Sequence, residues 1–179
     1  MTIRKIIISL LLMLSYGCGR AQQVTQGTIS SLTGVHAVTV EYDFSNALVD
    51  GIPLNDYIEI SQLTEGDSYR QEFEQEKKEI IADFIEEFND TNCPILLTIS
   101  TNPAVSMLIQ VKSISRNGNT ITCDYTFKEK SSGHILAEIA LTAKDGRCGS
   151  FSNLMGDAFE EAGKKLGKFI KKNLKSSKR

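Results

Sequence analysis

The sequence contains no tryptophan, and it has only three prolines and two histidines among its 179 residues. Nothing in this composition indicates a disordered, repetitive or collagen-like chain. There is no Cys-X-X-Cys pair and no cysteine–histidine spacing of a zinc site, so we expect no bound metal. A nucleophilic site needs a histidine beside a serine or cysteine, and neither His36 nor His134 lies in a supporting motif such as Gly-X-Ser-X-Gly. We therefore predict no catalytic residues, no cofactor and no enzymatic activity.

Long apolar runs are also lacking. The longest run, "IIISLLLML" at residues 6–14, follows the basic residues Arg4 and Lys5 and precedes small and polar residues. A transmembrane helix needs about 20 apolar residues, so this run is too short to span a bilayer. Charge, a short apolar stretch and small residues in that order are typical of a secretory signal peptide. We predict that residues 1–21 are a signal peptide and that the mature chain has no transmembrane span.

Two cleavage sites fit this leader. Gly19 and Ala21 stand at the −3 and −1 positions of an ordinary cut before Gln22. Alternatively, "LSYGC" places Gly17 directly before Cys18, which favours removal of residues 1–17 and lipidation of Cys18. Acyl chains on Cys18 would anchor the protein, with each buried methylene contributing about 0.8 kcal/mol. Both cuts export the protein, either as an outer-membrane lipoprotein or as a periplasmic protein.

Net charge gives no sign of nucleic-acid binding. The full chain carries 20 basic and 22 acidic residues, a net charge of −2. Removal of residues 1–17 leaves 18 basic residues against 22 acidic ones, a net charge of −4. A mildly acidic chain lacks the electrostatic signature of a nucleic-acid-binding protein, so we expect no nucleic-acid partner.

The mature length of about 160 residues fits one domain with a hydrophobic core. The polar stretch at residues 22–34 is predicted to be a linker that leads into a strand. Residues 35–174 are predicted to form a single α+β domain, and residues 175–179 a basic tail. Within the domain, "VHAVTVEYDF" at residues 35–44 alternates as a strand does.

Apolar residues that recur every three or four positions predict two long helices. The first begins at Ser68, where Ser68 and Gln71 match a capping box, and continues to about Asn89. The second covers residues 151–174. Its glycines Gly156, Gly163 and Gly167 fall side by side next to the apolar stripe. Three glycines in one sector indicate a close neighbour. We favour packing against the first helix or the sheet, and a homodimer seam is the alternative.

Between the two helices the sequence predicts an antiparallel meander. "ILLTIS" at residues 95–100 is interrupted by Asn102-Pro103, and the strand pattern then resumes up to an Asn-Gly hairpin at residues 117–118. Two more strands follow, joined by "SSG". The order β-α-β-β-β-α predicts a two-layer α+β sandwich, with a mixed, mostly antiparallel sheet and two amphipathic helices on one face.

This order of elements resembles a group of bacterial envelope lipoproteins that includes the N-terminal domain of TolB and small lipoproteins of the LptE and CsgG type. The similarity covers about residues 68–174, and its best part is "KEKSSGHILAE", where Ser132-Gly133 form a turn before the next strand. The resemblance implies a role in assembly or transport rather than catalysis. It gives no functional residues.

Two regions are candidate binding surfaces. The irregular segment 43–66 contains Asp50 and Tyr57, and binding residues often lie in such connections. The second region is the end of the last helix, where Lys168, Lys171 and Lys172 belong to a basic cluster that would suit an acidic partner or lipid headgroups. Tyr42 and Phe44 are predicted to pack in the core or at a sheet edge.

Three cysteines remain beyond the leader. Cys123 shares a strand face with apolar residues and is predicted to be a free buried thiol. If one disulfide forms, Cys123–Cys148 is the pair that the predicted topology brings closest, and Cys93 would then stay free.

The hypothesis from the sequence is a non-enzymatic accessory or binding protein of the bacterial cell envelope. It would act through contacts with a protein or another envelope component, with a lipid anchor or in the periplasm. The alternative is an extracytoplasmic hydrolase with an unrecognised site, which would require a deep pocket around His36 or His134.

Overall fold

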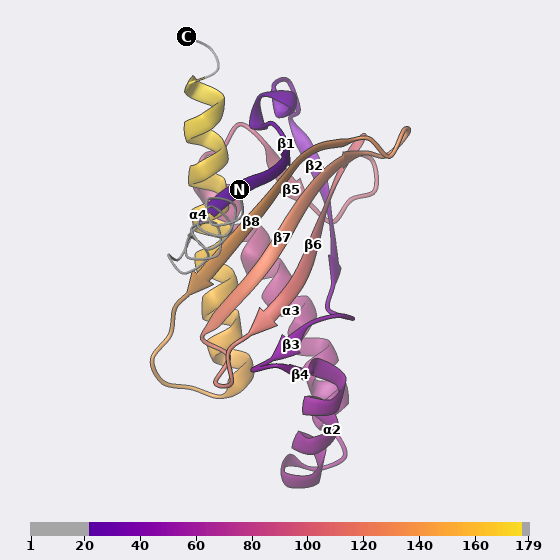
Figure 1. Cartoon of the computed structure of the whole chain (residues 1–179), viewed down its shortest axis with the longest axis vertical. Helices are drawn as coiled ribbons and strands as arrows, with labels where there is room; N and C mark the ends of the chain where they lie inside the picture. The colour runs from indigo at the N-terminus through magenta and orange to yellow at the C-terminus, as the bar shows by residue number, and fades with distance from the viewer. Residues whose placement is uncertain (1–21, 177–179) are drawn as a thin grey trace, which may run out of the picture.

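The computed structural model describes residues 22–176, with a sheet and three α-helices (Figure 1). The elements in chain order are β1 (Gln22–Gly27), the short 3-10 helix η2 (Ile29–Leu32), β2 (Ala37–Asp43), β3 (Leu48–Val49), β4 (Ile52–Pro53), α2 (Leu54–Glu65), α3 (Tyr69–Asp90), β5 (Leu96–Thr98), β6 (Val105–Ile114), β7 (Thr120–Glu129), β8 (Ile135–Lys144) and α4 (Phe151–Ser176).

The strands form one mixed sheet in the order β1-β8-β7-β6-β2-β5. The four strands from β1 to β6 are antiparallel, whereas β2 is parallel to both β6 and β5. After Asp43 pairs with Gln110, the chain bulges out and returns as β3, where Leu48 pairs with Ser113. β3 therefore continues the edge that β2 begins, and β4 pairs only with β3. The α+β class and the mostly antiparallel sheet are confirmed.

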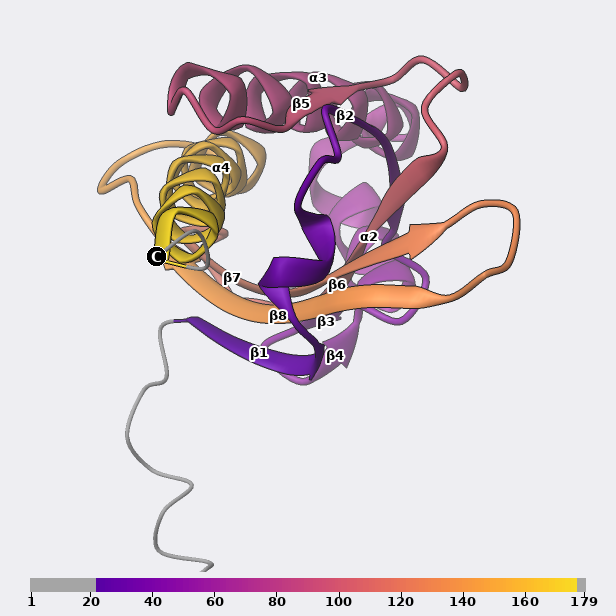
Figure 2. The same cartoon turned by 90° about the horizontal axis from the view of Figure 1, so that it is seen from above.

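Within residues 22–176 the helices cover one face of the sheet (Figure 2). Along β7 the residues at every second position are fully buried beneath α3 and α4, and these are Ile121, Cys123, Tyr125 and Phe127. The opposite face carries polar pairs: the Thr122 and Thr142 hydroxyls are 3.0 Å apart, and Lys112 forms a 3.2 Å ion pair with Asp124. This alternation is what an antiparallel sheet with one solvated face requires. The predicted placement of both long helices on one face is confirmed.

α3 and α4 run parallel and pack closely through glycines. A Cβ atom at Gly163 would lie 2.5 Å from the carbonyl oxygen of Phe84, and one at Gly167 would lie 3.0 Å from that of Phe88. Real Cβ atoms do not approach backbone as closely as at Gly163, so glycine is required there, whereas a Cβ atom at Gly167 would first meet the side chain of Thr91. The prediction that these glycines pack against the first long helix is confirmed for Gly163 and Gly167. Their surface is occupied within the chain, so it is not the seam of a homodimer.

Three aromatic rings join the layers at the centre of the core. The Phe84 ring stacks on the Tyr125 ring with a centroid distance of 5.6 Å, and it meets the Phe159 ring edge-on at 6.5 Å. All three side chains are fully buried. Because they come from α3, β7 and α4, this contact fixes both helices on the sheet.

The predicted linker at residues 22–34 is wrong. Residues 22–27 form β1, which pairs with β8, and Thr25 donates a 2.6 Å hydrogen bond to the Glu138 carboxylate. Ile29 and Leu32 of η2 are buried in the core. The polar composition misled the prediction because β1 is an edge strand whose outward side chains face water. β1 is ordered because it pairs with β8, which lies more than a hundred residues further along the chain.

Three smaller expectations also need correction. Ser68 makes no side-chain capping hydrogen bond, so the capping box is wrong, although α3 begins directly after it. Residues 95–114 form two strands on opposite sides of β2 instead of one interrupted strand. β5 is held by Asn89, whose amide exchanges hydrogen bonds of 2.9 and 3.1 Å with the backbone of Leu97. α4 continues to Ser176, so the first two residues of the predicted tail are helical.

None of the helices within residues 22–176 has a stretch that is both long and apolar enough to cross a bilayer.

Candidate functional site

Asp50 and Tyr57, the two residues predicted to bind a partner in segment 43–66, have different environments. Asp50 is exposed in the tight turn between β3 and β4, where it adopts a φ of 51°. Tyr57 is half-buried, and its ring lies 4.8 Å from the ring of Phe151. Tyr57 therefore attaches α2 to the start of α4, and only Asp50 of this pair is freely accessible.

The two aromatic residues at the end of β2 also differ. Phe44 is buried as predicted, and the Nζ atom of Lys77 lies 5.4 Å above its ring. Tyr42 is 41% exposed and lies beyond the residues of β2 that pair with β5, so of the two predicted locations it takes the sheet edge and not the core. It lies at the end of β2, where its ring contacts only the edge of Phe44 among the described aromatic residues.

The same end of the molecule exposes large apolar side chains. On α2, Leu63 is 87% exposed and Ile60 is 56% exposed, while Leu54 and Ile58 face inward and are buried. Ile60 and Leu63 are three residues apart, so they lie together on the outward face of the helix. Leu48 and Ile52 from the β3–β4 hairpin are 40% and 42% exposed. We call Leu48, Ile52, Ile60 and Leu63 the α2-end surface; α2 lies beyond the end of the sheet in Figure 1.

The predicted lysines lie at the opposite end, near the end of α4. Lys171 is half-buried, and its Nζ atom donates a 2.7 Å hydrogen bond to the Thr91 carbonyl oxygen just after α3. A cation at this position is stabilised by the C-terminal end of the helix, where unpaired carbonyl oxygens carry partial negative charge. Lys171 thus has a structural contact, whereas Lys168 and Lys172 are exposed.

His36 and His134 are both exposed, His36 just before β2 and His134 in the turn between β7 and β8. The three cysteines in the described residues are free, so the guess of a Cys123–Cys148 disulfide is wrong and the predicted free buried thiol is confirmed. Burial raises the pKa of the Cys123 thiol to about 12 and also raises the pKa of Cys93. Cys148 is exposed. The predicted lipidation residue Cys18 lies outside the described residues.

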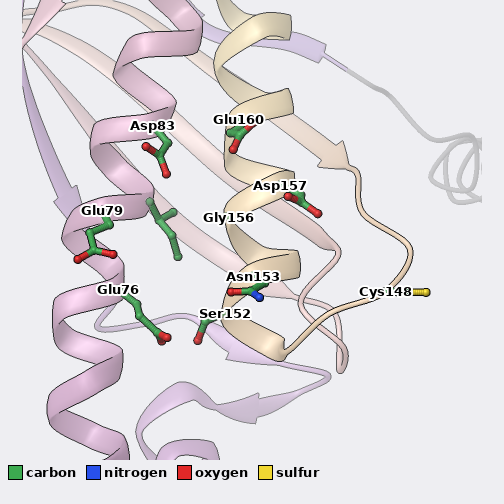
Figure 3. Close-up of a pocket in the computed structure, with 10 residues that line it drawn as sticks. Glu76, Glu79, Asp83, Cys148, Ser152, Asn153, Gly156, Asp157 and Glu160 are labelled. Carbon is green, nitrogen blue, oxygen red and sulfur yellow. The ribbon is translucent and has the colours of Figure 1, made fainter.

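A groove between α3 and α4 gathers acidic side chains (Figure 3). Its floor is Gly156 and Ile80, and the absence of a side chain at Gly156 creates the hollow, which has a volume of about 430 Å³. The Cys148 sulfur, at the rim, points away from it in Figure 3. The polar residues that line the groove, which we call the acidic groove, are Glu76, Glu79, Asp83, Ser152, Asn153, Asp157 and Glu160.

Lys164 lies one turn beyond Glu160 of the acidic groove on α4. Its Nζ atom lies 3.3 Å from the Glu87 carboxylate on α3 and 3.9 Å from the Glu160 carboxylate on its own helix. Burial raises the pKa of Glu160, Lys164 lowers it, and repulsion from neighbouring carboxylates raises it again, so that the pKa is above its ordinary value. Burial is the largest of these causes, and Lys164 is the largest one that opposes it.

The sequence did not reveal the acidic groove. Its carboxylates look like the solvated faces of two separate helices, and only the register of α3 on α4 brings them together. One signal was present: Gly156 precedes Asp157 and lies one turn before Glu160. Among residues 22–176, no three histidine, cysteine or acidic side chains are close enough together to hold a metal ion.

Comparisons with known proteins give only distant structural similarities. No family model and no curated protein matches the chain. The PelC dodecamer from Paraburkholderia phytofirmans matches with a TM-score of 0.42 and 8% sequence identity, covering 80% of this chain and 96% of that one. Protein XCC0632 from Xanthomonas campestris, of family DUF330, matches with a TM-score of 0.38 and 14% identity over 56% of this chain.

The match spans 62% of the length of the Xanthomonas protein. Similarities this distant assign neither a family nor a function. Neither of the two proteins is of the TolB, LptE or CsgG type, so that resemblance stays a prediction.

Proposed function

We propose that this protein is a non-enzymatic accessory protein of the bacterial cell envelope that binds another envelope component through the α2-end surface. The observation that carries the proposal is the exposure of Leu63 and Ile60 on the outward face of α2. Burial of one such side chain contributes about 1.5–3 kcal/mol. Adjacent apolar side chains left in water are typical of a surface that a partner covers.

Contacts with α3 and α4 fix α2, and with it Ile60 and Leu63 of the α2-end surface, on the rest of the fold. Tyr57 packs on Phe151 from the inner side of α2, and Arg70 at the start of α3 forms a 3.6 Å ion pair with Glu59. A partner that docks there meets a preformed helix and does not have to pay the conformational entropy of ordering it. Asp50, exposed in the adjacent turn, supplies a charge at the edge of this surface.

The leader supports the envelope location. If Cys18 carries acyl chains, only three residues separate it from Gln22, the first residue of β1, which is paired with β8. Four residue steps span at most about 14 Å when fully extended. The proposed anchor would therefore hold the domain against the membrane, where the proposed partner is an envelope component.

A photo-cross-linking amino acid at position 60 tests the binding surface in the cells that encode the protein. We expect a discrete cross-linked product from position 60 and none from position 86, an exposed position on the outer face of α3. Leu63→Glu, made in the position-60 variant, should remove the product, because a charge would enter the apolar contact.

Thr64→Glu is the matched control, since it adds the same charge at the next exposed position of α2. Both substitutions should change the free energy of unfolding by less than about 0.5 kcal/mol, as surface changes usually do. The proposal fails if positions 60 and 86 give the same products, or if Leu63→Glu and Thr64→Glu have equal effects.

A further inference from the structure

Most of the carboxylates that line the acidic groove form no ion pair with a lysine or arginine in the described part of the chain. Among residues 22–176, no lysine or arginine forms an ion pair with Glu76, Asp83 or Asp157. The helix dipoles do not account for them either, because each lies beyond the first turn of its helix, where that effect falls off. The groove therefore concentrates negative charge for which the fold gives no local reason.

Lys164 shows what kind of group fits between the two helices. Its ammonium lies between Glu87 of α3 and Glu160 of α4, at 3.3 and 3.9 Å. One turn closer to the helix N-termini, Asp83 and Asp157 line the groove from the same two helices. At their level Gly156 has no side chain and leaves the space beside Ile80 open, with Asp83 on one side of it and the Asp157 carboxylate on the side nearer the loop that carries Cys148 (Figure 3).

Ser152 provides an independent sign of a missing partner. Only 7% of this residue is exposed, and its hydroxyl makes no hydrogen bond within the described chain. In Figure 3 it projects from the first turn of α4 toward α3, at the end of the groove near Glu76. Its oxygen faces the groove, where it would accept a hydrogen bond from an ammonium N–H donor.

We propose that the acidic groove binds a linear polyamine, with its ammonium groups on the carboxylates and its methylene linkers on Ile80 and Gly156. The carboxylates follow one another along parallel helices about one turn apart, ~5.4 Å, which is close to the spacing of amines joined by three or four methylenes. They do not converge on one point in the described residues, as a metal ion would need. The volume of about 430 Å³ suits a small ligand.

Calorimetric titration of the purified protein with spermidine tests the proposal. Asp83→Asn combined with Asp157→Asn should weaken binding by about tenfold, because two charge-assisted hydrogen bonds are lost. The matched control is Glu72→Gln combined with Glu86→Gln, which removes the same charge from exposed positions of α3 outside the groove. The control should retain the wild-type affinity to within about twofold, since distant exposed charges are screened by salt.

Ser152→Ala distinguishes a specific binding site from nonspecific electrostatic attraction, because it leaves the net charge unchanged. We expect it to weaken spermidine binding by about threefold or more, through loss of one hydrogen bond. Circular dichroism checks that each variant is folded. Equal affinities of the two charge pairs, no effect of Ser152→Ala, or no binding at all would overturn the proposal. It would also be overturned if the groove instead takes the lysines of a second copy, seen as self-association that the Asp83/Asp157 pair abolishes. This test is independent of the α2-end surface.

Discussion

Gly163→Ala is expected to destabilise the protein, whereas Gly156→Ala is expected to stabilise it, although both changes add one methyl group to α4. At Gly163 the new Cβ atom would lie 2.5 Å from the Phe84 carbonyl oxygen, which belongs to the rigid backbone of α3. Separating the helices should cost more than the helix propensity of alanine returns, for a net loss of about 1–3 kcal/mol.

At position 156 the new methyl group would lie 3.7 Å from the Ile80 side chain, an ordinary contact. There the gain in helix propensity, about 0.5–1 kcal/mol, remains. Urea unfolding followed by circular dichroism measures both free energies. Each kcal/mol corresponds to about 2–4 °C in Tm for a domain of this size. If the two variants had the same stability, the close approach of α3 and α4 would be wrong.

Phe84→Ala is expected to have the largest effect of any single change discussed here, a loss of about 3–5 kcal/mol in the free energy of unfolding. Its ring is fully buried and contacts Tyr125 of the sheet and Phe159 of α4. The cavity would therefore open where all three elements meet. Phe84→Leu keeps most of the volume and should cost less than about 1.5 kcal/mol.

The control for Phe84 is Phe169→Ala, a change of the same chemistry at a half-buried position of α4. It should cost less than half as much, because less apolar surface becomes exposed. Denaturant unfolding monitored by circular dichroism compares the variants. Equal losses at the two positions would mean that the aromatic cluster is not the centre of the core.

The two long helices and the three long strands were predictable because their patterns are long and local. α3 and α4 repeat apolar residues every three or four positions, and the Asn117-Gly118 turn marks the β6–β7 hairpin. β1 was not predictable, since Val24 is its single apolar residue and its partner strand is far away in the chain. Tyr42 was predictable only as a core or edge residue, because its exposure depends on where β5 stops pairing with β2.

The candidate binding surfaces were predictable in part. Segment 43–66 was the expected location, yet its exposed residues are Ile60 and Leu63, and Tyr57 is a packing residue. A loop pattern cannot show which side of a helix faces outward. The acidic groove depends on the register of two helices that four strands, β5 to β8, separate in the sequence. That register is set by contacts of Gly163 and Gly167, which only the folded chain reveals.

The claim on which the proposed function depends is that the chain is exported to the cell envelope. Mass spectrometry of the native protein, purified from fractionated cells that encode it, measures this directly at the N-terminus. We predict a protein in the membrane fraction that begins at Cys18 and carries a diacylglyceryl group on its sulfur. A chain that begins at Gln22 would agree with export but would show that the protein has no lipid anchor at Cys18. A cytosolic chain that still contains residues 1–17 would contradict the account.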